Sequence, residues 1–148
     1  MNMDRATFES FKSQGYNRIP VVREVLADTD TPLSTYLKLG KGPHSYFFES
    51  IQGGEKWGRF SIIGLPCSTV LRVVGDRLTV ECEGEVIEAL ETSDPFEFIE
   101  AYKAQFNVAE VTDNQRFGGG LVGYFAYDSV RYVEQSIGPA KDPGALDT

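Results

Sequence analysis

The chain has 148 residues, of which 41% are hydrophobic and 24% are charged, a balance typical of one globular domain. Its 14 Lys and Arg residues against 22 Asp and Glu residues give a formal net charge of −8, which disfavours nucleic acid and anionic membranes as partners. One histidine and two cysteines, without the close spacing of zinc ligands, argue against a zinc site. No stretch approaches the roughly 20 apolar residues of a membrane helix, and the polar N-terminus lacks a signal segment. We therefore expect a cytoplasmic protein in which Cys67 and Cys82 are buried, reduced thiols.

The N-terminal part of the chain predicts a helix followed by a strand. The helix covers residues 4–14, and Gly15 ends it in the left-handed conformation. Residues 18–26 are β-branched and apolar enough for a strand, in which Pro20 indicates a sheet edge or a strand start.

A second helix is predicted at Thr31, whose hydroxyl can cap the helix before a proline at the first helical position. Gly40 ends this helix. The spacing of its apolar residues predicts a buried face made of Leu33, Tyr36 and Leu37.

The middle of the chain is rich in strand signals. We expect five strands, at residues 45–51, 57–65, 69–74, 77–81 and 85–90. Residues 52–56 form a hairpin turn between the first two strands, and Gly75-Asp76 and Glu83-Gly84 turn the chain later. In the fourth strand, the alternation predicts a packed face with Leu78, Val80 and Cys82 and a solvated face with Arg77, Thr79 and Glu81.

The strongest helix start is Asp94-Pro95-Phe96-Glu97, in which Asp94 caps the helix and Glu97 reaches back to the cap amide. Its aromatic stripe consists of Phe96, Ile99, Tyr102 and Phe106. A strand over residues 120–127 and a short helix over residues 128–135 follow. Together these elements predict an α+β fold, a single domain with an antiparallel sheet or sheets and a few packed helices.

Two motifs invite a catalytic or nucleotide-binding interpretation, and the local pattern weakens both. Residues 118–123 match G-x-G-x-x-G, but polar residues precede the motif and strand-forming residues follow it, where a dinucleotide site needs a strand and then a helix. His44 follows a turn, with no nucleophile elbow in the sequence, so a surface or capping histidine is the better interpretation.

Phe47-Phe48-Glu49-Ser50 is an apolar strand that ends in a carboxylate and a hydroxyl. Such an end could present a polar handle at an aromatic pocket for an amino acid, with Lys56 and Arg59 available to a ligand carboxylate. The alternative is an ordinary strand end whose hydroxyl is satisfied locally.

Three ordered motifs make the chain resemble the anthranilate synthase component I family. They are Phe47-Phe48-Glu49-Ser50, Gly-Arg-Phe-Ser-Ile-Ile-Gly at residues 58–64, and Gly-Gly-Leu-Val-Gly-Tyr-Phe-Ala-Tyr-Asp at residues 119–128. Residues 15–20 and 31–39 extend the resemblance over nearly the whole chain. Phe47-Phe48 stands where the family usually has aliphatic residues, a departure that could reshape an indole pocket.

The resemblance implies an N-terminal regulatory domain of an enzyme that converts chorismate and ammonia to anthranilate and pyruvate. It implies that Mg²⁺ and the catalytic residues belong to a C-terminal chorismate-binding domain, and that a glutamine amidotransferase subunit supplies ammonia. For this chain we therefore expect no catalytic residue, no metal and no cofactor. The implied ligand is L-tryptophan, the feedback inhibitor, bound by Ser50, Glu49 and Phe48, with Arg59, Phe60 and Ser61 nearby on the opposing strand.

The resemblance divides the chain into this domain at residues 1–137 and an interdomain linker at residues 138–148, with the catalytic domain absent. The Pro- and Gly-rich end of the chain favours a cloned domain over a natural chain. Two alternatives stay open: the same domain of aminodeoxychorismate synthase, and a docking module for the amidotransferase. We further expect Tyr124, Phe125 and Tyr127 to form an apolar patch where the catalytic domain would pack.

Overall fold

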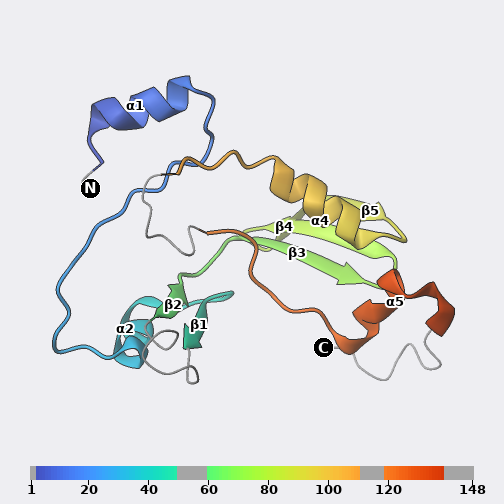
Figure 1. The fold of residues 1–148 in the computed structure, drawn as a ribbon. Coiled ribbons are helices and arrows are strands. Elements are labelled where there is room, and N and C mark those ends of the chain that lie inside the picture. The colour runs from blue at the N-terminus through green and yellow to red at the C-terminus, as the bar shows by residue number, and fades with distance from the viewer. Residues whose placement is uncertain (1–2, 50–59, 111–118, 139–148) are drawn as a thin grey trace. The chain divides into compact units, whose positions relative to one another are not determined.

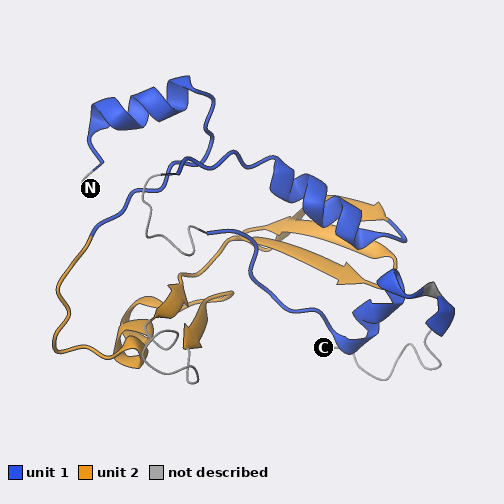
Figure 2. Cartoon of the chain, in the orientation of Figure 1, with its two compact units in different colours: residues 1–23, 92–148 blue, residues 24–91 orange. Residues whose placement is uncertain are grey.

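The structure is a computed structural model that describes residues 3–49, 60–110 and 119–138. In the described part of the chain, two helices are followed by the strands of two antiparallel sheets and then by the remaining helices (Figure 1), so the predicted α+β class is confirmed. The chain divides into two compact units (Figure 2): Met1–Arg23 with Thr92–Thr148 form the first, and Glu24–Glu91 form the second.

In the first unit, helix α1 spans Arg5–Ser13, as the sequence predicts. The Asp4 carboxylate accepts a hydrogen bond of 2.8 Å from the backbone N–H of Thr7, which satisfies one of the free amides at the helix start. Gly15, with φ of +88°, turns the chain away after the helix. The turn brings Tyr16 edge-on to Phe11, with 5.7 Å between ring centroids.

Helix α4 spans Pro95–Ala104 and begins at the predicted cap. The Asp94 carboxylate accepts hydrogen bonds from the backbone N–H groups of Phe96 and Glu97, at 3.1 and 3.2 Å. The predicted return contact from Glu97 is wrong, because the Asp94 N–H donates instead to the hydroxyl of Thr92, at 3.1 Å. A nearby hydroxyl thus takes the role that a capping box gives to the third helical residue.

The predicted aromatic stripe of α4 is half-buried along its length. At the C-terminal end, Tyr102 meets Phe106 edge-on with 5.4 Å between ring centroids. At the other end, Phe96 contacts the rings of Phe125 and Tyr132, at 5.4 and 6.2 Å. These contacts hold the C-terminal segment against α4 within the first unit.

The short helix predicted at residues 128–135 is confirmed in three consecutive pieces. A 3₁₀ turn, η1, covers Tyr127–Ser129, helix α5 covers Val130–Val133, and a second 3₁₀ turn, η2, covers Gln135–Ile137.

A pair of asparagines joins the chain after α1 to the chain after α4. Asn17 donates from its side-chain amide to the carbonyl of Gln105 (2.6 Å) and accepts from the backbone N–H of Asn107 (2.7 Å). Asn107 in turn donates from its side-chain amide to the carbonyl of Gly15, at 3.1 Å. Backbone hydrogen bonds extend this clamp into an isolated parallel bridge between Arg18 and Val108.

Two predicted strands, at residues 18–26 and 120–127, are wrong. Arg18 makes the isolated bridge, and the rest of each segment pairs with no strand among the described residues. Pro20 cannot donate to a ladder, and an extended segment becomes a strand only when another backbone accepts its hydrogen bonds. Both segments instead leave large apolar side chains exposed, including Val21, Leu26, Tyr124 and Phe125.

In the second unit, β3 (Thr69–Val74), β4 (Arg77–Cys82) and β5 (Glu85–Glu91) form an antiparallel sheet in the order β3-β4-β5. Glu83 and Gly84 both have positive φ, at 54° and 86°, which is the geometry of a tight two-residue hairpin. A bulge between β4 and β5 shifts the register after Val80.

The centre of β4 is buried on both faces. Leu78 and Val80 are fully buried, as the alternation predicts. Thr79 is also buried, so the expectation of a solvated face is wrong at this position. A central strand is paired along both edges, and alternation alone does not say what covers each of its faces.

Strands β1 (Tyr46–Glu49) and β2 (Ser61–Gly64) form the other sheet, and helix α2 spans Pro32–Leu39. The predicted turn at residues 52–56 lies outside the described residues. The buried face predicted for α2 is wrong at Leu33 and Leu37, which are exposed. Cys67 is exposed and Cys82 half-buried, so the expectation of two buried thiols also fails.

We predict that Asn17→Ala lowers the free energy of unfolding by about 1–2 kcal/mol, because it removes two side-chain hydrogen bonds worth roughly 0.5–1.5 kcal/mol each. Gln14→Ala is the matched control, since the Gln14 amide bonds only to Ser10 of its own helix among the described residues. Urea denaturation followed by circular dichroism measures both variants. Equal losses of stability would contradict a clamp between the two segments.

Candidate functional site

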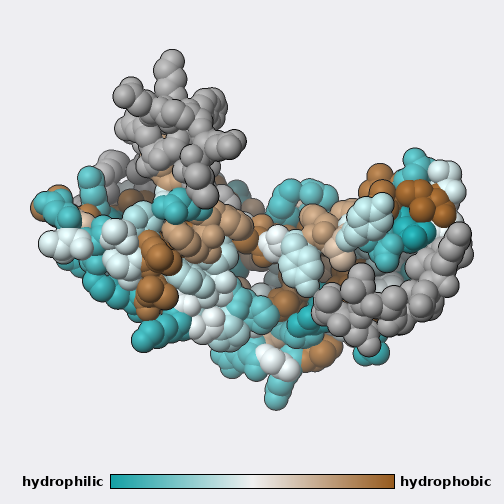
Figure 3. All heavy atoms as spheres, turned by 90° about the horizontal axis from the view of Figure 1, so that it is seen from below, coloured by the Kyte–Doolittle hydropathy of each residue, from teal (hydrophilic) through white to brown (hydrophobic). Residues whose placement is uncertain are grey.

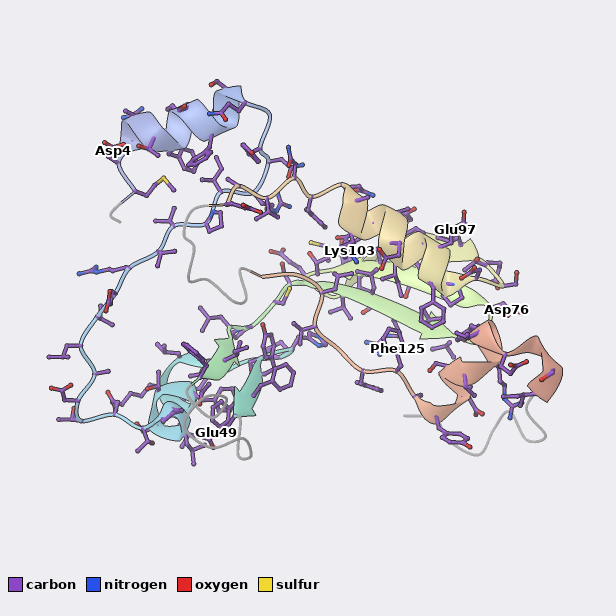
Figure 4. The ribbon with its side chains drawn as sticks, in the orientation of Figure 1. Asp4, Glu49, Asp76, Glu97, Lys103 and Phe125 are labelled. Atoms are coloured by element: carbon purple, nitrogen blue, oxygen red, sulfur yellow. The ribbon has the colours of Figure 1, made fainter. Side chains whose placement is uncertain are left out.

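The hairpin of β1 and β2 carries the described residues of the predicted site, and its register sorts them onto two faces. Tyr46 lies opposite Gly64 and Phe48 opposite Ile62, whereas Glu49 lies opposite Ser61. Directly opposed residues of an antiparallel pair share a face, and consecutive residues point to opposite faces. Phe48 and Glu49 therefore lie on different faces of the hairpin (Glu49 is labelled in Figure 4).

Helix α2 packs on Phe47, which lies on the same face of the hairpin as the exposed Glu49. The ring of Tyr36 stacks on Phe47, with 5.6 Å between centroids and 18° between the ring planes. The Tyr36 hydroxyl lies 3.2 Å from the hydroxyl of Ser45, which donates to the carbonyl of Gly42, also at 3.2 Å. A ring stack and a hydrogen bond on one side chain thus fix α2 against the start of β1.

Polar contacts stabilise the start of α2, and the sequence predicted only the Thr31 cap among them. Thr31 and Ser34 form a reciprocal capping box, with hydrogen bonds of 3.1 and 3.0 Å. The Asp30 carboxylate accepts hydrogen bonds from Lys38 and from the Ser34 hydroxyl. These bonds, first that from Lys38 and then that from Ser34, hold the pKa of Asp30 below its ordinary value of 3.8.

The other face of the hairpin is an open aromatic surface. The rings of Tyr46 and Phe48, two residues apart on β1, lie 5.0 Å apart. Gly64 faces Tyr46, and a Cβ at this position would overlap the Tyr46 ring. Phe48 is 52% exposed, and Phe60, just before β2, is 51% exposed. Among the described residues, the hairpin therefore presents aromatic area to solvent on this side.

Of the six predicted site residues, the structure brings Phe48, Glu49, Phe60 and Ser61 to one hairpin. Ser50 and Arg59 lie outside the described residues. Sequence reasoning missed Tyr46 as a neighbour of Phe48, although their spacing of two residues in a strand was a usable signal. It named Tyr36 as a buried helix residue but did not connect this ring to the hairpin.

The remaining candidate motifs do not assemble a site in the described part of the chain. After Gly119 and Gly120 the backbone stays irregular until η1 begins at Tyr127, so the helix that a dinucleotide fingerprint requires does not follow. His44 is exposed in a turn, with φ of 58°. No three His, Cys, Asp or Glu side chains gather as metal ligands among the residues described. None of the described helices has the length and apolarity to cross a membrane.

Three relatives from different bacteria carry the name anthranilate synthase component 1. The chain is 52% identical over 144 residues to anthranilate synthase component 1 of Pseudomonas aeruginosa, a match that covers 97% of this chain and 29% of that protein. The same-named protein of Neisseria gonorrhoeae is 48% identical over 132 residues, covering 89% of this chain and 27% of the relative. That of Aquifex aeolicus is 42% identical over 145 residues, covering 97% and 29%.

The chain is homologous to one segment of anthranilate synthase component 1. The resemblance drawn from the sequence motifs is thereby confirmed, and the chain spans less than a third of the length of these relatives. No protein-family model matches it, and no solved structure does. In each of these relatives, a segment similar to this chain is thus joined to a much larger remainder.

The close approach of Tyr46 to Gly64 generates a test of the hairpin. We predict that Gly64→Ala weakens the β1–β2 pairing by about 1–3 kcal/mol, because the added Cβ must displace the Tyr46 ring. Gly123→Ala is the control, since a Cβ at this position meets nothing within 4 Å. Amide hydrogen exchange of β1 and β2 should be roughly tenfold or more faster in Gly64→Ala only. Unchanged exchange would show that the hairpin does not depend on this contact.

Proposed function

We infer that this chain is the N-terminal domain of anthranilate synthase component 1 and that its first hairpin supplies part of the site for tryptophan, the feedback inhibitor. The observation that carries the assignment is the 52% identity to the Pseudomonas aeruginosa protein over 97% of this chain. The names of the relatives also support anthranilate synthase over aminodeoxychorismate synthase.

In this proposal, the exposed aromatic face of the hairpin receives the indole ring. Tyr46, Phe48 and Phe60 offer aromatic area to the ligand, and burial of apolar surface is worth roughly 25 cal/mol per Å². The proposal gives the Ser50 hydroxyl, two residues after Phe48 in the sequence, the role of a hydrogen-bond partner for the ligand.

The charged groups of the ligand need partners from the opposite face or from the rest of the protein. Glu49 suits the ligand ammonium and Arg59 its carboxylate, since charge-assisted hydrogen bonds are the stronger ones. Glu49 lies opposite Ser61, on the other face of the hairpin from Phe48, so in this proposal its carboxylate reaches the ligand past the end of β1 rather than across the aromatic surface.

Synthesis of anthranilate from chorismate and ammonia is assigned to the remainder of the longer protein, with the amidotransferase as the ammonia source. Mg²⁺ would there neutralise the carboxylates of chorismate. In the described part of this chain, no three acidic, His or Cys side chains gather that could hold the ion. In this proposal, the role of the present chain is to help position the inhibitor.

We predict that Ser50→Phe in the full-length enzyme weakens tryptophan inhibition at least tenfold and leaves uninhibited activity nearly intact. The lost hydrogen bond is worth about 0.5–1.5 kcal/mol, and the larger side chain also fills the indole site. Inhibition curves for Ser50→Phe are compared with those for Ser93→Phe, the same exchange at an exposed position before α4. Unchanged inhibition by tryptophan in Ser50→Phe would remove Ser50 from the site.

The 148-residue chain by itself should turn over no chorismate with ammonia and Mg²⁺ and should bind tryptophan weakly or not at all. The reason is that the catalytic groups and the other wall of the tryptophan site belong to the remainder of the protein. A fluorescence assay for anthranilate and titration calorimetry with tryptophan measure the two properties, with the full-length enzyme as positive control. Measurable turnover by the chain would refute the assignment of catalysis to the remainder.

A further inference from the structure

The segment at residues 121–126 has the composition of a strand that is covered on both faces. Its alternation puts Leu121 and Phe125 on one face and Val122 and Tyr124 on the other. Apolar side chains on both faces are typical of a strand buried inside a sheet, whereas a strand with one solvated face alternates apolar with polar residues.

The structure leaves this segment open. Tyr124 is 80% exposed, Phe125 68% and Tyr127, which follows it, 91%. Figure 3 shows hydrophobic residues on one face of the molecule, and Figure 4 labels Phe125 in the stretch of chain that leads to η1 and α5. Within the first unit, the Phe125 ring contacts Phe96.

The backbone of residues 121–125 is also available for hydrogen bonding. Among the described residues, residues 121–125 make no backbone–backbone hydrogen bond. The next residue, Ala126, accepts one at its carbonyl from the N–H of Ser129. A Cβ at Gly123 would meet nothing within 4 Å. Unpaired backbone groups cannot be buried without partners, so a cover over these rings must also pair the backbone.

The remainder of the polypeptide is the cover that the observations favour. The chain spans 29% of the Pseudomonas aeruginosa relative, so a much larger mass of protein belongs beside it. A second copy is the poorer candidate, because each copy carries a net charge of −8 and like charges repel.

We propose that residues 121–126 form a strand that adds to a sheet edge in the remainder of the longer protein, with Tyr124 and Phe125 packed on opposite faces. This addition is the mode by which extended segments join an exposed sheet edge, where the backbone supplies affinity and alternate side chains supply specificity. The inference rests on the proposed function only in taking the chain as part of anthranilate synthase component 1.

Amide hydrogen exchange tests the proposal in the full-length protein and in the 148-residue chain. The amides of residues 121–126 should exchange at least about a hundredfold more slowly in the full-length protein. Fast exchange in both proteins would overturn the proposal, as would slow exchange in both. Sedimentation velocity of the 148-residue chain tests whether a second copy covers the segment instead. A dimer in which residues 121–126 are protected from exchange would also overturn the proposal.

Side-chain variants of the full-length protein show whether the protection of residues 121–126 depends on the side chains of that segment. Phe125→Ser and Tyr124→Ser should each speed exchange at residues 121–126 at least tenfold. Val133→Ser, which also truncates an exposed apolar side chain, should leave that exchange unchanged. Equal effects of all three variants would contradict the proposal.

Tryptophan inhibition of the Ser50→Phe variant separates this proposal from the proposed function. Loss of inhibition while residues 121–126 stay protected from exchange supports both assignments. Unchanged inhibition while these residues stay protected removes only the tryptophan site.

Discussion

The clamp between Asn17 and Asn107 is the constraint on which the first unit depends. Residues 90 positions apart along the chain are joined there by hydrogen bonds from both side chains and both backbones. The Arg18 guanidinium lies over the Phe106 ring, 4.6 Å from its centroid, and adds an attraction beside the polar contacts. The clamp closes a loop that contains the whole second unit, so its hydrogen bonds must offset the entropy of bringing the two ends together.

In the second unit, the pleat of a short hairpin decides what the candidate site can do. Because consecutive residues of a strand point to opposite faces, β1 gives one ring to α2 and leaves others to solvent. Phe47 is used in packing against Tyr36, and Phe48 stays exposed beside Tyr46. One side of the hairpin thus packs against α2, and the other side leaves aromatic surface exposed. A strand of only four residues therefore contributes both to packing within the unit and to its exposed aromatic surface.

The exposed apolar residues of the chain fit the proposal that it is one part of a longer protein, like its relatives. Within the described residues, the fully buried apolar side chains are Leu78, Val80 and Ala109, whereas Leu26, Tyr124 and Tyr127 are almost fully exposed. A protein that evolved as part of a larger fold keeps such residues for surfaces outside the segment itself. The formal net charge of −8 adds a repulsive contribution to any association of two copies.

The sequence by itself determined the features that depend on neighbouring residues. Thr31 and Asp94 cap their helices, and Glu83-Gly84 turns the chain, because these preferences arise within a few residues of backbone. The family was also readable, from motifs whose order and spacing match known proteins. Only the tertiary structure decided the rest. It showed that residues 18–26 and 120–127 find no strand partner among the described residues, that Thr79 is buried, and that Phe48 and Glu49 belong to opposite faces. The physical reason is that pairing, burial and the Asn17–Asn107 clamp depend on backbone that arrives from far away in the chain, which no local pattern encodes.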